Sequence, residues 1–561
     1  MGRPNQAPLP PRPPTRRSFF TRSAGAALAT AAVSLAPSLV PLARAAGPRF
    51  QHGVASGDPL ADRVILWTRV TPAEPASSAL QSVDWLVAAD PALTQVVASG
   101  RTRTGAWRDH TVKVDVTGLA PAATYYYRFS SGGEASPVGR TRTLPAGPAG
   151  HLRAAVMSCS NHAAGHFNAY RRIAERADLD LLLHLGDYLY EYGSGQFGNV
   201  RPTLPPTEIL TLGDYRQRHA QYKSDPDLQE LHRQHPMVAI WDDHEIANDA
   251  WQRGAQNHDP ATEGLWAGRV ARGLKAYDEW MPVRELAEPR QNQRSFHFGD
   301  LAEIVLLEER FGARSKQLPA PIPVPGLGQG FVAAGRYLDP ARSMLGAAQE
   351  AWLADTLQQS TARWKLIGQG VMVAQLKALG RTNADGGSLF VNPDQWDGYP
   401  PARDRLFDVF AGTMAPPPVD NVVVLTGDIH SAWAADLTRD PNNPDPAAGG
   451  YDPATGAGSL AVEFVTTSIT SPGIDDPDGS LARLAANQNP HFRHIDLNQR
   501  GYLLLDVTPE RVVGEFWAVD TVAVTSNVQT FTAAWEVQHG TRRLVASAMT
   551  NPRPNPPAPA P

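Results

Sequence analysis

The stretch LDLLLHLGDYLYE, residues 179–191, decides the fold class of this chain. Its first part, Leu179–His184, is a short, nearly continuous apolar run, which is typical of a strand buried on both faces of a helix-covered sheet. The run leads directly into Gly186-Asp187 and then into aromatic and acidic residues up to Glu191. Because ligands of open α/β sheets bind beyond the carboxyl ends of the strands, these polar residues are candidates for a functional site.

The same pattern recurs over the larger part of the chain. Further apolar runs of strand length lie at residues 152–157, 237–241, 364–368 and 422–426. Helical spacing precedes two of these runs, at 169–177 and 345–357, and the later runs 460–465, 502–507 and 513–519 favour antiparallel strands. We therefore predict an α/β fold for residues 151–520, a two-sheet sandwich flanked by helices.

Residues 48–146 predict a different architecture. Short β-type runs at 64–70, 83–87 and 125–129 are separated by turn residues, which is typical of an antiparallel β-sandwich. We expect a small domain similar to fibronectin type III, joined to the rest by a Gly/Pro-rich linker at 145–150. Residues 521–561 are expected to form a C-terminal segment with a mobile, proline-rich tail.

Composition excludes several classes of protein. The 561 residues exceed what one hydrophobic core of about 250–300 residues accommodates. With 42% hydrophobic residues the chain is not a disordered one. The formal net charge of −5 is close to neutral for this length, which argues against a stable nucleic-acid complex and against a polybasic membrane-surface protein. Cys159 is the only cysteine, so no intramolecular disulfide is possible.

Residues 1–45 have the composition of a secretory signal. Arg16-Arg17 and two phenylalanines precede an Ala/Leu-rich stretch from Ala24 to Leu42, and Ala43-Arg44-Ala45 supplies a small-residue cleavage site. The paired arginines favour the twin-arginine type of signal. We expect export by the twin-arginine translocation machinery, to the periplasm or out of the cell. No other stretch approaches the about 20 apolar residues of a spanning helix, so no transmembrane segment is expected.

Metal-ligating groups follow four of the apolar runs. Each has a simpler explanation: Asp187 as a turn or cap residue, Cys159 as an inert buried side chain, Tyr190 as a packing aromatic, and His430 as a core histidine. Separate structural explanations do not account well for metal-ligating groups at all four strand ends. The joint pattern favours one shared metal site. The groups are Cys159 and Asn161 after the first run, Asp187 and Tyr190 after the second, Asp243, His244 and Asn248 after the third, and Asp428 and His430 after the last.

These motifs are similar to those of a known family. Leu185–Glu191, Trp241–Glu245 and Leu425–Ser431 resemble the calcineurin-like metallophosphoesterase signature. More narrowly, with His52–Pro59, Ser158–Asn161, Trp396–Tyr399, Asn489–His491 and Gly501-Tyr502, the chain resembles the PhoD-like alkaline phosphatase and phospholipase D family from about residue 50 to about 520.

The resemblance implies ferric iron (Fe³⁺) and calcium (Ca²⁺) as cofactors. It assigns Cys159, Asp187, Tyr190 and His430 to the iron, and Asp187, Asp243 and Asp428, with Asn248 as a further neighbour, to the calcium. The donor chemistry agrees, because thiolate and phenolate groups favour trivalent iron and carboxylates suit calcium.

The remaining site residues are expected to act on substrate. His244 follows Asp243 directly and is the candidate for proton donation to the leaving oxygen or for phosphate contact, and metal ligation is the less favoured alternative. Asn161 and Arg310 are expected to bind substrate. Relatives commonly have Asp-Thr-Arg where this chain has Glu308-Glu309-Arg310, which leaves the surroundings of Arg310 open. For Trp396–Tyr399 the simpler interpretation is a buried turn around Gly398.

The functional hypothesis is an exported, metal-dependent hydrolase of phosphomonoesters or phosphodiesters that works at alkaline pH. Its substrates are then small phosphate esters, phosphodiester polymers or lipids. Two alternatives stay open at this point. One is a phospholipase D-like diesterase acting on lipid headgroups, and the other is a non-catalytic envelope binding protein with a structural metal site. The spare histidine and the few ligands per metal favour catalysis.

Overall fold

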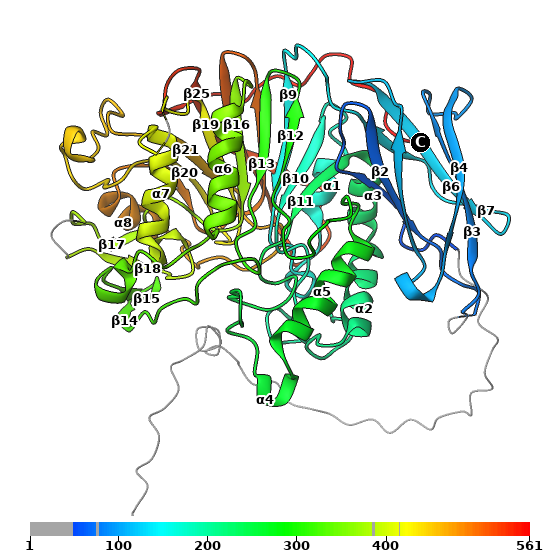
Figure 1. The fold of residues 1–561 in the computed structure, drawn as a ribbon, viewed down its shortest axis with the longest axis horizontal. Helices are drawn as coiled ribbons and strands as arrows, with labels where there is room; N and C mark the ends of the chain where they lie inside the picture. Colours follow the sequence, from blue (N-terminus) through cyan, green and yellow to red (C-terminus); the bar gives the residue numbers. More distant parts are fainter. Residues whose placement is uncertain (1–48, 75–77, 384–386, 415) are drawn as a thin grey trace, which may run out of the picture. The chain divides into compact units, whose positions relative to one another are not determined.

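Two facing β-sheets form the centre of the protein, with helices on their outer faces (Figure 1). The computed structural model describes residues 49–74, 78–383, 387–414 and 416–561. The expected signal sequence, residues 1–45, lies outside the described residues. The two-sheet α/β sandwich predicted from the apolar runs is confirmed.

The first sheet has ten strands. Its centre is parallel, because β10 pairs in parallel with both β9 and β11, and β23 continues it in antiparallel fashion beside β9. The strand order is β26 (Leu544–Ala546), β25 (Gln529–Gln538), β24 (Arg511–Val519), β23 (Arg500–Val507), β9 (Leu152–Met157), β10 (Leu181–Leu185), β11 (Pro236–Ile240), β1 (Val54–Gly57), β2 (Arg63–Arg69) and β5 (Thr111–Thr117).

The second sheet has seven strands. Strands β13, β16, β19 and β21 are parallel neighbours, and β21 also pairs antiparallel with β20. The run at 460–465 was expected to be an antiparallel strand. The corresponding β21 is antiparallel to its neighbour β20 but parallel to its other neighbour, β19. The order is β12 (Arg294–Phe298), β13 (Ala302–Leu306), β16 (Trp364–Gln369), β19 (Val422–Thr426), β21 (Ala461–Val465), β20 (Ala432–Leu437) and β22 (Phe492–Asp496).

Alternate residues of each central strand enter different cores, which explains the continuous apolar runs. In β9, Leu152, Ala154 and Val156 face the second sheet, whereas Ala155 and Met157 face helices. The outer face of the first sheet packs against α1 (Asn168–Ala174), α2 (Leu212–Lys223), α3 (Pro226–Gln234) and α5 (Trp266–Trp280). That of the second packs against α6 (Ala347–Gln359), α7 (Pro400–Ala411) and α8 (Ser480–Gln488).

The N-terminal β-sandwich shares a sheet with the larger fold. Apolar side chains of β2 and β5 pack against those of a five-stranded sheet, and β1 pairs in parallel with β11. Through β1, β2 and β5 the first sheet thus continues without a break into the sandwich. The five-stranded sheet contains β4 (Val96–Thr104), β3 (Gln81–Ala88), β6 (Thr124–Ser131), β7 (Glu134–Ala135) and β8 (Gly139–Arg142).

The proline-rich tail is packed, which differs from the mobile tail expected from its composition. Strands β25 and β26 extend the first sheet, and the residues after them return along it. The guanidinium of Arg553 binds the carboxylate of Asp180, and Tyr126 Oη donates to Ala558 O at 2.6 Å. The side-chain amide of Gln234 donates to Ala560 O and accepts from Ala560 N. Tertiary hydrogen bonds replace the ladder that prolines cannot form.

Three smaller features were not predicted. A four-stranded sheet contains β14 (Ile322–Val324), β15 (Gly328–Phe331), β18 (Leu389–Val391) and β17 (Lys377–Leu379), and one short helix, α4, spans Pro260–Glu263. Short 3₁₀ turns also connect several elements, among them His162–Ala164. Over the described ranges, none of the helices has the length and apolar character needed to cross a membrane.

Candidate active site

Four strand ends place the predicted ligands at one edge of the two sheets. Strands β9, β10 and β11 are parallel, so the turns that follow them emerge side by side. The turn after β19 joins them from the second sheet, where a β-carbon on Gly427 would lie only 2.8 Å from that of Ser158. Only glycine permits this approach of the two sheets.

The backbone is strained at these turns. Cys159, Asp187, Asp428 and His430 all have positive φ, between 55° and 61°. This region is uncommon for residues other than glycine and costs of the order of 1–3 kcal/mol per residue, and such residues cluster at functional sites. The surrounding structure therefore holds four of the expected ligands in a strained backbone conformation, which fixes the direction of their side chains.

Glu245 fixes two of the turns at once. Its carboxylate accepts the backbone N–H of Asp187 at 3.1 Å, that of Tyr188 at 2.7 Å and that of Asp242 at 2.9 Å. The side chain is buried, and burial raises its pKa to about 7 although the three N–H donors oppose this. One carboxylate thereby satisfies the buried donors of the turns after β10 and β11. Sequence reasoning assigned Glu245 no role.

The four residues expected to bind iron lie together. Ligand atoms of Cys159, Asp187 and His430 lie within 4.8 Å of one another, and all three side chains are buried. Tyr190 Oη donates to Asp187 Oδ2 at 2.9 Å and lies 3.0 Å from His430 Nε2. His430 Nδ1 lies 2.9 Å from Pro472 O, so Nε2 is the ring nitrogen that faces the cluster.

A second group of carboxylates shares Asp187 with the first. Ligand oxygens of Asp187, Asp242, Asp243 and Asp428 lie within 4.8 Å of one another. Asp243 Oδ1 is buried without a hydrogen-bond partner among the described residues. The backbone N–H of Asn248 donates to Glu191 Oε1 at 2.9 Å, and its side-chain Nδ2 donates to Gln256 Oε1 at 3.1 Å.

The buried carboxylates of this cluster would be stabilised in their anionic forms by a bound cation. Burial raises the pKa of Asp187 well above its usual range, and Asp243 and Asp428 add to the shift while His244 opposes it. Burial likewise raises the pKa of the Cys159 thiol and of the Tyr190 phenol. Metal ions reverse such shifts, because they stabilise the anionic forms. The donor set and the orphaned Asp243 oxygen therefore fit bound metal ions.

His244 is held by a buried carboxylate. Its Nδ1 lies 2.7 Å from Glu191 Oε2, and its ring stacks on Tyr190 with a centroid separation of 4.1 Å. Burial opposes the charge of the imidazolium, but Glu191, Asp243 and Asp187 outweigh burial and raise the pKa of His244 well above 6.5. Glu191 thus fixes the ring and raises its pKa, and the sequence alone did not indicate this role.

Arg310 lies among the carboxylates of the candidate site. Its guanidinium is fully buried and donates to both oxygens of Asp242, to Asp394 Oδ2 at 2.7 Å and to Asp428 Oδ1 at 3.1 Å. The guanidinium compensates the buried charge of these carboxylates, and its contact with substrate stays a prediction. Arg310 is therefore a positioning residue for Asp428 and Asp242.

The side chain of Asn161 makes two hydrogen bonds to neighbouring loops. Its Oδ1 accepts the N–H of Ala163 at 2.9 Å as the cap of a short 3₁₀ turn, and its Nδ2 donates to Phe197 O at 2.8 Å. The side chain thus joins two loops beside the cluster. This geometry favours a structural role over a substrate contact.

The variant Glu308-Glu309-Arg310 segment is structural. Glu308 accepts the N–H groups of Arg310, Phe311 and Gly312, and the Glu309 carboxylate accepts Gly370 N and Trp396 Nε1. Gly398 approaches Pro393 so closely that a β-carbon there would lie 1.9 Å from its carbonyl oxygen. The turn at Trp396–Gly398 is a buried structural turn, as its simpler interpretation held.

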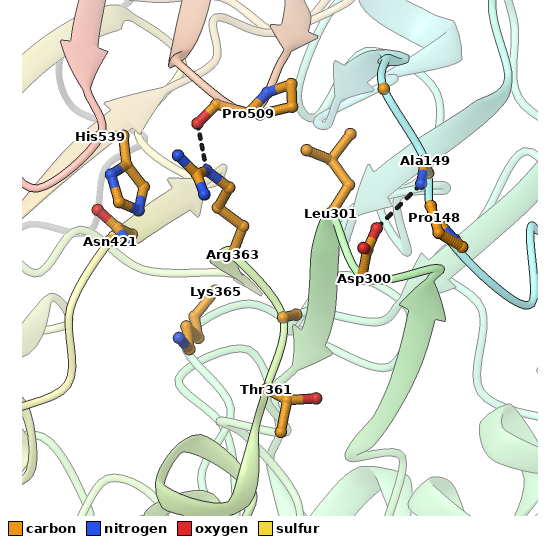
Figure 2. Close-up of a pocket in the computed structure, with 12 residues that line it drawn as sticks. Pro148, Ala149, Asp300, Leu301, Thr361, Arg363, Lys365, Asn421, Pro509 and His539 are labelled. Carbon is orange, nitrogen blue, oxygen red and sulfur yellow. Dashed lines mark hydrogen bonds between the residues drawn. The ribbon is translucent and has the colours of Figure 1, made fainter.

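A surface cavity of about 630 Å³ lies away from these groups (Figure 2). It is lined by Arg363 and Lys365 at the start of β16, by Asn421 just before β19, and by Pro148–Gly150 of the linker. These positions are at the opposite ends of the strands from the candidate site. None of the predicted site residues lines the cavity.

Comparisons with known proteins agree with this geometry. Residues 154–516 match the model of the PhoD-like phosphatase, and residues 34–145 match that of the PhoD-like phosphatase N-terminal domain. Alkaline phosphatase D of Bacillus subtilis (strain 168) is 35% identical over 515 residues, 88% of this chain and 83% of that protein. A solved structure of PhoD superposes with a TM-score of 0.78 at 33% identity, covering 92% of this chain and 95% of that one. The chain belongs to the PhoD-like phosphatase family and is a phosphoesterase.

Proposed function

We propose that this phosphoesterase is metal-dependent and hydrolyses phosphomonoesters, phosphodiesters or both at alkaline pH. Cys159, Asp187, Tyr190 and His430 would hold Fe³⁺, and Asp187, Asp243, Asp428 and Asn248 would hold Ca²⁺. The observation that carries this proposal is the shared Asp187, whose buried carboxylate belongs to both groups of donors. When bound, such ions would neutralise charge on a phosphate ester and lower the pKa of water at the site.

His244 is the proposed general acid. Glu191 binds Nδ1, so Nε2 is the nitrogen that can face a phosphate ester. The neighbouring carboxylates raise the pKa of the ring well above 6.5. A protonated Nε2 beside the carboxylate group can donate its proton to the leaving oxygen. Glu191 and Glu245 act as positioning residues, the first through His244 and the second through the backbone at Asp187.

The test compares two esters and two variants. The chain from Gly47 onward is assayed at alkaline pH with 4-nitrophenyl phosphate and bis(4-nitrophenyl) phosphate, before and after chelation and with calcium added back, and iron is measured by mass spectrometry. Asp187→Asn is expected to lose both metal and turnover. Asp84→Asn, in β3 of the N-terminal sandwich, where the carboxylate is 48% exposed, is the matched control and is expected to keep both. Retained metal and turnover in Asp187→Asn would overturn the proposal.

The same assay separates the ester classes. The ratio of the two rates distinguishes a phosphatase from a diesterase, and a choline-headgroup phospholipid added as a third substrate tests the phospholipase D-like alternative. Membership of a phosphatase family argues against the hypothesis of a non-catalytic binding protein.

We also propose export through the twin-arginine pathway. The support is the sequence of residues 1–45, with Arg16-Arg17 ahead of an apolar stretch and a small-residue cleavage site. Replacing both arginines by lysine in the full chain is expected to leave the unprocessed protein inside the cell. Unchanged export of that variant would refute the assignment, and the periplasmic and extracellular fractions would show where the protein goes.

A further inference from the structure

Two partly exposed aromatic rings border the candidate site. Phe197 stacks on His430 with a centroid separation of 6.2 Å and lies 5.8 Å from the ring of Tyr190. Tyr192 lies 5.5 Å from the ring of His244 and 5.5 Å from that of Phe197. The pair therefore extends from a candidate metal ligand to the candidate general acid.

The exposure of these two rings contrasts with that of their neighbours. Tyr190, His244 and His430 are buried, at 2%, 4% and 8% relative exposure, whereas Tyr192 and Phe197 are only half-buried. Their outer surface adds apolar, π-electron-rich area to the edge of a site whose other members are carboxylates, imidazoles and a thiol. Such a surface does not assist phosphate binding, but it can bind a planar ring.

The loop that carries the rings is fixed in place. Phe197 O accepts from Asn161 Nδ2 at 2.8 Å, Ser194 N donates to Pro206 O at 2.8 Å, and Gly193 N donates to Gln196 Oε1 at 3.0 Å. Gly198 has a φ of 100°, and a β-carbon there would lie 2.7 Å from the backbone of Ala163. The rings are therefore pre-organised, which lowers the entropic cost of ligand binding.

We propose that Tyr192 and Phe197 form a subsite for a planar heteroaromatic ring on the leaving group, so that the enzyme favours nucleoside phosphates over phosphate esters of plain sugars. The subsite is on the leaving-group side because Tyr192 contacts His244, the proposed donor to the leaving oxygen. This inference rests on the proposed function. Base-on-aromatic stacking is strong enough to give a preference of about tenfold.

The test uses two substrates that break the same bond. Adenosine 5′-monophosphate and ribose 5-phosphate release the same 5′-hydroxyl and differ only in the base. We expect a kcat/KM ratio of about ten in favour of the nucleotide. Phe197→Leu and Tyr192→Leu are each expected to lower that ratio about threefold or more. Trp107→Leu, which removes an aromatic ring of 61% exposure elsewhere on the surface, is the control and is expected to keep the ratio.

A second measurement needs no variant. Adenosine is expected to compete with 4-nitrophenyl ester hydrolysis by the unmodified protein, whereas ribose at the same concentration is not. A kcat/KM ratio near one, or equal inhibition by adenosine and ribose, would overturn the subsite while leaving the phosphoesterase proposal intact. Failure of the protein to hydrolyse any of the esters would instead count against the proposed metal-dependent mechanism.

Discussion

Replacing Glu245 by glutamine tests whether one buried carboxylate holds the ligand turns. The glutamine side chain has nearly the same shape as that of glutamate, but it offers one oxygen where the carboxylate offers two. In the native structure Oε2 accepts two N–H groups, of Asp187 and Asp242, and Oε1 accepts the N–H of Tyr188. Whichever way the amide turns, an NH₂ group must face at least one backbone N–H donor.

The expected cost follows from that count. The better orientation keeps the oxygen on Asp187 and Asp242 and leaves Tyr188 N–H facing a second donor in a buried place. A buried donor without a partner costs about 1–3 kcal/mol, and the two retained bonds also weaken when a charged acceptor becomes neutral. We expect Glu245→Gln to lose about 2–3 kcal/mol of unfolding free energy. Asp187, at a φ of 55°, also loses support, so metal content and kcat should fall together.

The measurement is urea unfolding of chelator-treated protein at alkaline pH, followed by metal analysis and ester hydrolysis of the untreated samples. Removing the metal first excludes the stabilisation that ligand binding itself provides. Glu175→Gln is the matched control, because Glu175 is 47% exposed and its ion pairs with Arg171 and Arg172 are on the surface. If Glu245→Gln unfolds within about 0.5 kcal/mol of the unmodified protein, the reasoning from hydrogen-bond satisfaction is wrong.

Three further predictions concern other parts of the molecule. Deleting Asn551–Pro561 should lower the melting temperature, because Asp180, with a fully buried side chain, loses its partner in the tail; an unchanged melting curve would mean that the tail contributes nothing. Gly398→Ala should destabilise strongly or prevent folding, since its β-carbon would lie 1.9 Å from a carbonyl oxygen, and normal yield and stability of this variant would contradict the close approach. Burial lowers the pKa of His52, His184 and His219 to about 3 from 6.5. Between pH 6.5 and pH 3 only the unfolded chain therefore takes up these protons. Together the three histidines lower the unfolding free energy by about 4 kcal/mol per pH unit as the pH falls through this range. His219→Phe should reduce the pH slope of unfolding free energy by about 1.4 kcal/mol per unit, and an unchanged slope would exclude this source.

Much of the architecture could be predicted because the decisive signals are local. The apolar runs at 152–157 and 422–426 coincide with β9 and β19, and the others lie within two residues of the observed strand limits. The four-stranded sheet around β15 and β18 could not be predicted, since its strands are three or four residues long and carry no periodic pattern. The packed tail was missed because composition says nothing about long-range partners such as Asp180.

The sequence alone determined which residue types follow which strands. A buried strand ending in Gly-Asp, a second in Asp-Asp-His and a third in Gly-Asp-x-His are facts of chain order, and parallel pairing brings such ends to one edge. From these facts come the fold class and the expectation of one shared site at these strand ends, whereas the assignment of Cys159, Asp187, Tyr190 and His430 to one metal came from the family resemblance.

Only the tertiary structure decided what each polar group does. Arg310 and Asp394 are 84 residues apart in the sequence, and Glu191 and His244 are 53 residues apart. No local sequence pattern predicts either pair. Burial makes an unpaired charge costly, so the fold gives these groups partners from distant strands, and those partners fix whether a side chain meets substrate or only supports one that does. The sequence identifies the candidate site residues, and long-range packing determines which of them can meet substrate and which support the others.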